Sequence, residues 1–72
     1  MKILERTEDY REYLALNGYV YRVTKQPLFF RVENLTLKTF GMYNRYLNGL
    51  SGNSYKKALD KYIKEEREYE II

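Results

Sequence analysis

The sequence contains no cysteine, no histidine and no tryptophan among its 72 residues. Without cysteine the chain has no disulfides, and without cysteine or histidine it lacks the usual ligands of zinc and haem. The same gap removes the serine and cysteine triads that use an imidazole base. We therefore expect a protein that binds a partner, with no catalytic residues, no metal and no cofactor.

Long apolar runs are also missing from the sequence. No stretch approaches the ~20 residues that a membrane span requires. The first six residues, Met1 to Arg6, already carry charges where a signal peptide would need an apolar segment. We expect one small cytoplasmic domain over residues 1–72, with no membrane partner.

Aromatic residues are abundant, because nine tyrosines and three phenylalanines make up 17% of the chain. A tyrosine buries a large ring and keeps its hydroxyl in contact with water. Such rings suit a small core in which every residue lies near the surface, and they equally suit a binding face. The core is the preferred interpretation.

The net charge of +3 is unevenly distributed along the chain. Residues 1–16 carry a net charge of −1, residues 17–64 carry +7, and residues 65–72 carry −3. A basic middle segment between acidic ends favours an anionic partner more than the total charge does.

The N-terminal third is open to two interpretations. Thr7 is a suitable cap for a helix over 7–16, whose first turn would carry Glu8 and Asp9. Asn17-Gly18 is a strong hairpin signal and would instead make 12–16 a strand paired with 19–23. Because 10–16 does not alternate apolar and polar residues, the helix is preferred.

The remainder predicts a hairpin and two helices. Residues 19–24 and 28–33 alternate as two strands. Residues 35–40 fit either a third strand or a helix, and we predict an extended start followed by a helix over 39–48. Apolar residues at helical spacing predict the last helix over 54–69. The fold class is α+β: an N-terminal helix, a β-hairpin with or without a third strand, and two C-terminal helices.

This order of elements resembles a double-stranded-RNA-binding domain, whose last helix begins with lysines after a glycine-containing loop. The matching stretch runs from Gly52 to Ala58 and includes Lys56 and Lys57. The resemblance implies binding to an RNA backbone, although the extra helix over 41–50 departs from the family. A second analogy treats 39–48 and 54–69 as a helix-turn-helix with the hairpin as a wing.

Basic residues at the start of the last helix form the first candidate site. Lys56 and Lys57 lie in its first turn, where exposed amides attract phosphates. Lys57, Lys61 and Lys64 form a stripe opposite the apolar face. Asp60 and Lys64, Lys61 and Glu65, and Lys64 and Glu68 are each four residues apart, so local ion pairs are the competing explanation.

The hairpin provides the second candidate site. Arg22, Phe29 and Arg31 project from the same face, where arginines and an aromatic ring suit single-stranded nucleic acid. The predicted first helix is the competing occupant of that face. Lys38 and Arg45 complete the basic set in the middle segment.

Two functions remain open from the sequence. One is a non-enzymatic nucleic-acid-binding or regulatory protein, of the size often encoded by phages and mobile elements, that contacts DNA or RNA phosphates. The other is a protein-binding module, such as an inhibitor of a host or defence protein or a small subunit of a complex, with Tyr69, Ile71 and Ile72 available for docking or homodimer formation. A continuous basic face would favour nucleic acid, and an exposed apolar patch would favour protein.

Overall fold

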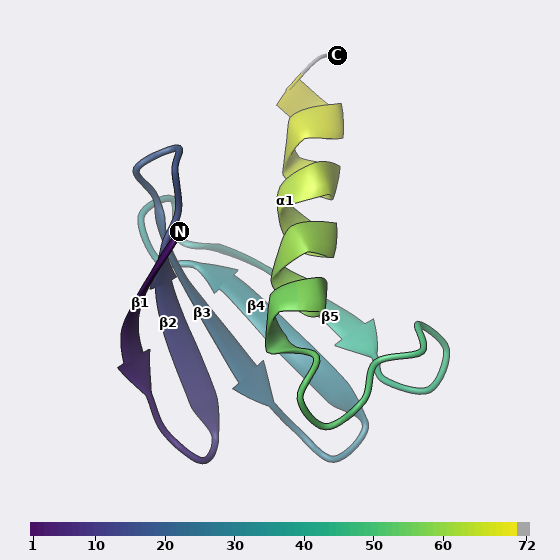
Figure 1. The fold of residues 1–72 in the computed structure, drawn as a ribbon. Helices are drawn as coiled ribbons and strands as arrows, with labels where there is room; N and C mark the ends of the chain where they lie inside the picture. Colours follow the sequence, from purple (N-terminus) through teal and green to yellow (C-terminus); the bar gives the residue numbers. More distant parts are fainter. Residues whose placement is uncertain (71–72) are drawn as a thin grey trace.

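The chain forms a five-stranded antiparallel sheet with one C-terminal helix against one of its faces (Figure 1). The computed structural model describes the backbone of residues 1–70 and the side chains of residues 1–66. The elements are β1 Lys2–Arg6, β2 Tyr10–Leu14, β3 Val20–Lys25, β4 Phe29–Asn34, β5 Thr39–Asn44 and α1 Tyr55–Glu70. Each strand pairs with the next in the chain, so the sheet order is β1-β2-β3-β4-β5.

The predicted N-terminal helix over 7–16 is wrong, because these residues belong to a turn and to β2. The Thr7 side chain does act on the backbone, since its Oγ1 accepts hydrogen bonds from the amides of Asp9 and Tyr10. The same contact that caps a helix here closes the turn between β1 and β2. The capping side chain of Thr7 therefore could not distinguish a helix over 7–16 from the turn between β1 and β2.

The alternative pairing through Asn17-Gly18 is the correct one. β2 pairs with β3, and the amide of Ala15 donates to the carbonyl of Tyr19 at 3.0 Å. Gly18 has φ 86°, a left-handed conformation that glycine adopts without strain. The strand was hidden in the sequence because Arg11 faces the helix side, so polar and apolar residues do not alternate along β2.

The predicted helix over 39–48 is also wrong. Residues 35–38 form a turn, 39–44 form β5, and 45–49 form a second turn. In both turns an asparagine ends the strand: Asn34 Oδ1 accepts from two amides that follow it, and Asn44 Oδ1 does the same. These asparagine turns break the helix that the spacing of the apolar residues predicted.

The hairpin and the last helix lie where the sequence predicts them, as β3, β4 and α1. Over residues 1–70 there is no N-terminal helix and one C-terminal helix in place of two, so this part of the chain has neither the double-stranded-RNA-binding arrangement nor the winged helix-turn-helix. The α+β class holds only in the coarse sense that a mostly β domain carries one helix.

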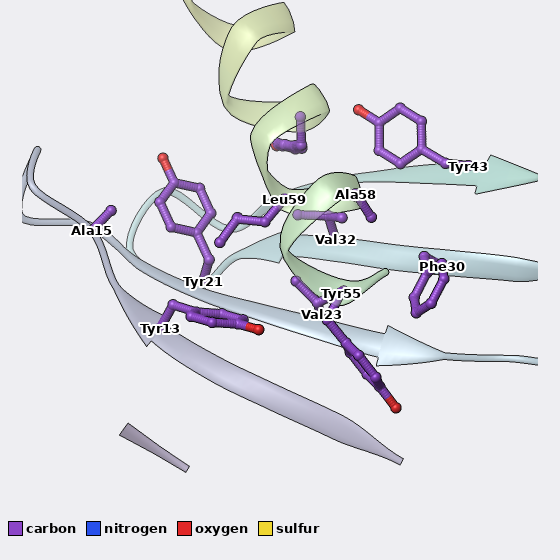
Figure 2. Packing of buried hydrophobic residues seen from close by; sticks show 11 residues of the cluster. Tyr13, Ala15, Tyr21, Val23, Phe30, Val32, Tyr43, Tyr55, Ala58 and Leu59 are labelled. Carbon is purple, nitrogen blue, oxygen red and sulfur yellow. The ribbon is translucent and has the colours of Figure 1, made fainter. Parts of the chain in front are cut away.

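The core lies between α1 and the middle strands of the sheet (Figure 2). Val23, Val32 and Phe30 point from β3 and β4 towards Leu59 and Ala58 of the helix. Aromatic rings fill much of the remaining space, and five tyrosines belong to the core: Tyr13, Tyr21, Tyr43, Tyr55 and Tyr62.

A polar layer joins the helix to the sheet beyond this core. Glu66 accepts hydrogen bonds from the Tyr21 hydroxyl at 2.9 Å and from the Asn34 amide at 3.0 Å. The Tyr43 hydroxyl donates to Glu65 at 2.7 Å. These bonds satisfy groups that burial would otherwise leave unpaired, and they fix how the helix lies across the strands.

Candidate functional site

The sheet face opposite α1, called the open face below, has no second layer over it among the described residues (Figure 1). Alternation along the strands and the pairing register assign its members. They are Lys2, Glu5, Tyr10, Glu12, Leu14, Val20, Arg22, Thr24, Phe29, Arg31, Glu33, Phe40, Met42 and Asn44.

The open face carries exposed apolar side chains at the β5 side of the sheet. Phe40 is 58% exposed and Met42 is 45% exposed, while Phe29 on β4 is half-buried. An antiparallel sheet that faces water usually presents polar residues on that side. The sheet would form equally well with polar residues at these positions, so the exposed apolar side chains indicate a role other than folding.

Both arginines of the open face have carboxylate neighbours. Arg22 Nε donates to Glu12 Oε1 at 2.9 Å, and Arg31 Nε lies 3.6 Å from Glu33 Oε1. The hydrogen bond to Glu12 raises the pKa of Arg22. With Lys2 and Glu5 of β1 included, the open-face members named above hold three acidic and three basic side chains, so this face is not a basic surface.

Aromatic rings orient the same two arginines. The guanidinium of Arg22 lies 4.7 Å from the ring centroid of Tyr10, and that of Arg31 lies 4.3 Å from the ring centroid of Phe40. Contact with a ring and with a nearby carboxylate restricts the position of each guanidinium on the open face. The result is a preformed surface of rings and planar cations.

Arg31 and Lys38 come together at one end of the open face. Both line a shallow hollow beside the turn between β4 and β5, together with Glu33 and Phe40. Lys38 occupies that turn with φ 60°. The fold thus gathers three charged side chains and one aromatic side chain around this hollow.

Arg45 does not join this group. Its Nη1 donates to the carbonyl oxygens of Gln26 and Pro27 at 3.3 and 3.1 Å, and its guanidinium lies 5.6 Å from the Phe30 ring. These contacts tie the end of β5 to the turn between β3 and β4. Arg45 therefore stabilises the fold and is not part of the open face.

The predicted helix lysines lie in the other layer of the molecule. Lys56, Lys57, Lys61 and Lys64 are exposed on α1 and are called the lysine ridge below, and the Nζ of Lys61 lies 5.9 Å from the ring centroid of Tyr43 on β5. None belongs to either of the two ion pairs found among residues 1–66. Neither the predicted pairing of Asp60 with Lys64 nor that of Lys61 with Glu65 is among them, and Glu65 accepts a hydrogen bond from Tyr43.

The predicted residues therefore belong to two opposite surfaces and form no single site. Arg22, Phe29 and Arg31 share the open face, as the alternation along the hairpin indicated. The sequence reasoning missed Tyr10, Phe40 and Met42, since both segments were taken as helices. Period-two alternation over 39–44 was the available signal. The predicted docking residues Tyr69, Ile71 and Ile72 and the Lys64 partner Glu68 lie outside the described side chains.

The fold defines a class of small domain, a five-stranded antiparallel meander with one helical layer. No protein-family model, curated protein sequence or solved structure matches this chain. Within the described residues, no helix has the length and apolarity that crossing a membrane requires. The same residues contain no group of three acidic side chains arranged to hold a metal ion.

Proposed function

We propose that this protein is a protein-binding module that receives its partner on the open face. The observation that carries the proposal is a sheet face without a covering layer that presents Phe40 and Met42 to solvent. Exposed apolar groups next to preformed polar ones are typical of surfaces that another protein covers.

The chemistry of the open face supports a protein partner. Aromatic residues, methionine and arginine are enriched at protein interfaces, and all three occur here. Arg22 and Arg31 already have carboxylate neighbours, so each offers a weaker attraction to a phosphate than a lone arginine. Because these arginines stack on rings, little side-chain entropy is lost when a partner docks on them.

Affinity capture with matched variants tests this function. The test variant combines Tyr10→Ala and Arg31→Ala, both on the open face, and the control combines Lys57→Ala and Lys61→Ala on the lysine ridge. Capture from an extract of the cells that make the protein should recover one defined protein after nuclease treatment. The open-face variant should lose that protein at least tenfold, while the control retains it.

Each alternative result has a clear meaning. Equal capture by both variants overturns the open face as the docking surface. Loss of all captured material on nuclease treatment overturns the protein-binding function itself. Circular dichroism on each variant establishes that the fold is retained.

A second function, binding of nucleic acid, draws support from the lysine ridge. Its four lysines, Lys56, Lys57, Lys61 and Lys64, are exposed, and Asp60 is the one acidic side chain exposed beside them in the described part of α1. A phosphate backbone attracted to such a ridge would bind with a strong dependence on salt. In a titration of single-stranded RNA and duplex DNA, the Lys57→Ala and Lys61→Ala variant should lower the salt slope by about two. Absence of binding at low salt removes this second function.

A further inference from the structure

The two edges of the sheet differ in how they are protected against pairing with another strand. β1 has an irregular register between Ile3 and Glu5 and carries charged residues, both of which hinder further pairing. β5 pairs with β4 without interruption over six residues and contains no charge, no proline and no bulge. In Figure 1, β5 forms the outer edge of the sheet.

The backbone groups available on β5 follow from its pairing with β4. The amide of Arg45, directly after β5, donates to the carbonyl of Leu28 at 2.9 Å. Because inward and outward groups alternate along an antiparallel ladder, the odd-numbered residues of β5 bond to β4. The amide and carbonyl groups of Phe40 and Met42 therefore point away from the sheet. No hydrogen bond within residues 1–66 uses them outside the sheet ladder.

The turn after β5 gives an independent check of this assignment. Asn44 is even-numbered, so its carbonyl should also point outward. That carbonyl accepts from the Asn48 amide at 3.2 Å and from the Asn48 side chain at 2.8 Å, and both donors belong to the turn beyond the strand. The outward bonding capacity of β5 is thus concentrated at Phe40 and Met42.

We propose that β5 pairs antiparallel with β5 of a second copy, which would form one continuous ten-stranded sheet. With the two-fold axis through Gly41, Phe40 of each copy lies opposite Met42 of the other. These are the residues whose amides and carbonyls point outward, so the register forms four backbone hydrogen bonds and leaves none of the four groups unused.

The side chains fit the same register. Residues directly opposite in an antiparallel pair share a face, so Phe40 meets Met42 of the second copy on the open face. Gly41 meets its own equivalent at the close, non-hydrogen-bonded position. Antiparallel pairing also brings the exposed turn residues Tyr46 and Leu47 of one copy towards Leu37 of the other, which is exposed as well.

A second copy is the occupant that these features favour over an unrelated extended peptide. The strand is self-complementary about one point, both in its hydrogen-bonding groups and in the apolar residues at its centre and its two ends. The interface is short, and we therefore expect a monomer–dimer equilibrium that depends on concentration.

Sedimentation velocity over a wide range of protein concentration tests the proposal. The wild-type chain should shift from monomer to dimer as concentration rises. Met42→Pro removes one outward amide without touching the bonds to β4, and it should remain monomeric. Met42→Val keeps the amide and should still dimerise.

Amide hydrogen exchange of the wild-type chain makes the test independent of any variant. The amides of Phe40 and Met42 should exchange quickly in dilute protein and slowly in concentrated protein. A monomer at every concentration, with both amides exchanging quickly throughout, overturns the proposal. A dimer that persists in folded Met42→Pro also overturns it, since the interface would then lie elsewhere. The single open-face variant Tyr10→Ala, on β2 and away from β5, should dimerise normally, which separates this result from the proposed function.

Discussion

The Tyr43 hydroxyl donates a hydrogen bond to Glu65 at 2.7 Å and thereby connects β5 to the helix. Burial first, and then this hydrogen bond, raise the pKa of Tyr43. Tyr43 is also the residue whose ring lies beside Gly41, where an added Cβ would approach the hydroxyl oxygen to 3.2 Å. The position of the Tyr43 side chain thus depends on Gly41 having no side chain.

Tyr43→Phe removes this hydrogen bond and leaves Glu65 with one partner fewer. We expect the free energy of unfolding to fall by about 2 kcal/mol, the usual range for bonds to charged groups. Urea unfolding followed by circular dichroism measures it. Tyr46→Phe is the matched control, because Tyr46 is 75% exposed and should change stability little. Equal stability of the two variants would show that the bond contributes nothing.

Alkaline pH should destabilise the domain through its buried tyrosines. Burial raises the pKa of Tyr21 to about 12 and also raises the pKa values of Tyr43 and Tyr62. The folded state then retains protons that the unfolded state releases near its ordinary pKa of 10.0.

Stability is therefore fully present below about pH 10 and is lost as pH rises towards the folded pKa values. Each such tyrosine contributes at most about 1.4 kcal/mol per pH unit. Urea midpoints measured on both sides of this range test the effect, and the decline should be shallower in Tyr43→Phe. A constant midpoint would contradict it.

Lys38→Gly should stabilise the turn between β4 and β5. Lys38 has φ 60°, a left-handed conformation that costs a residue with a side chain about 1 kcal/mol more than glycine. Thermal unfolding should show the gain. Lys38→Ala, which removes the charge and keeps the Cβ, should show none. A gain in both variants would mean that charge, and not the backbone, is the cause.

Leu59→Ala tests the helix–sheet core. Leu59 is fully buried between α1 and the sheet, and removal of such a side chain costs about 3 kcal/mol. Because small domains have total stabilities of only about 5 kcal/mol, the variant should retain about 2 kcal/mol and melt at a clearly lower temperature than the wild-type chain. Leu47→Ala, at a position 88% exposed, should leave the melting curve unchanged.

The sequence predicted correctly the elements in which the hydrophobic pattern matches the face that is buried in the fold. β3 and β4 alternate in hydrophobicity because one of their faces is covered by α1, and α1 has a regular apolar side for the same reason. β2 gave no such pattern, and in β5 the helical spacing of Phe40, Tyr43 and Leu47 competed with the alternation over 39–44. Arg11 faces the helix side with its guanidinium 4.2 Å from the centroid of the Tyr55 ring, so a charged residue takes a position where an apolar one is expected.

The candidate site was predictable to the same extent. Arg22, Phe29 and Arg31 share a face because they belong to the two strands whose alternation is clear. The contribution of Phe40 and Met42 was missed, because the helical spacing of Phe40 with Tyr43 and Leu47 favoured a helix over 39–48 in place of the strand. Pairing between distant segments decided these elements, and local propensity did not.

Photo-crosslinking from two positions tests the central claim most directly. A photoreactive benzoylphenylalanine would replace Phe29 on the open face in one variant and Lys57 on the lysine ridge in the other. Irradiation in the cells that make the protein should give one discrete protein adduct from position 29, resistant to nuclease, and none from position 57. Adducts from position 57 alone, or adducts removed by nuclease, would contradict a protein partner on the open face.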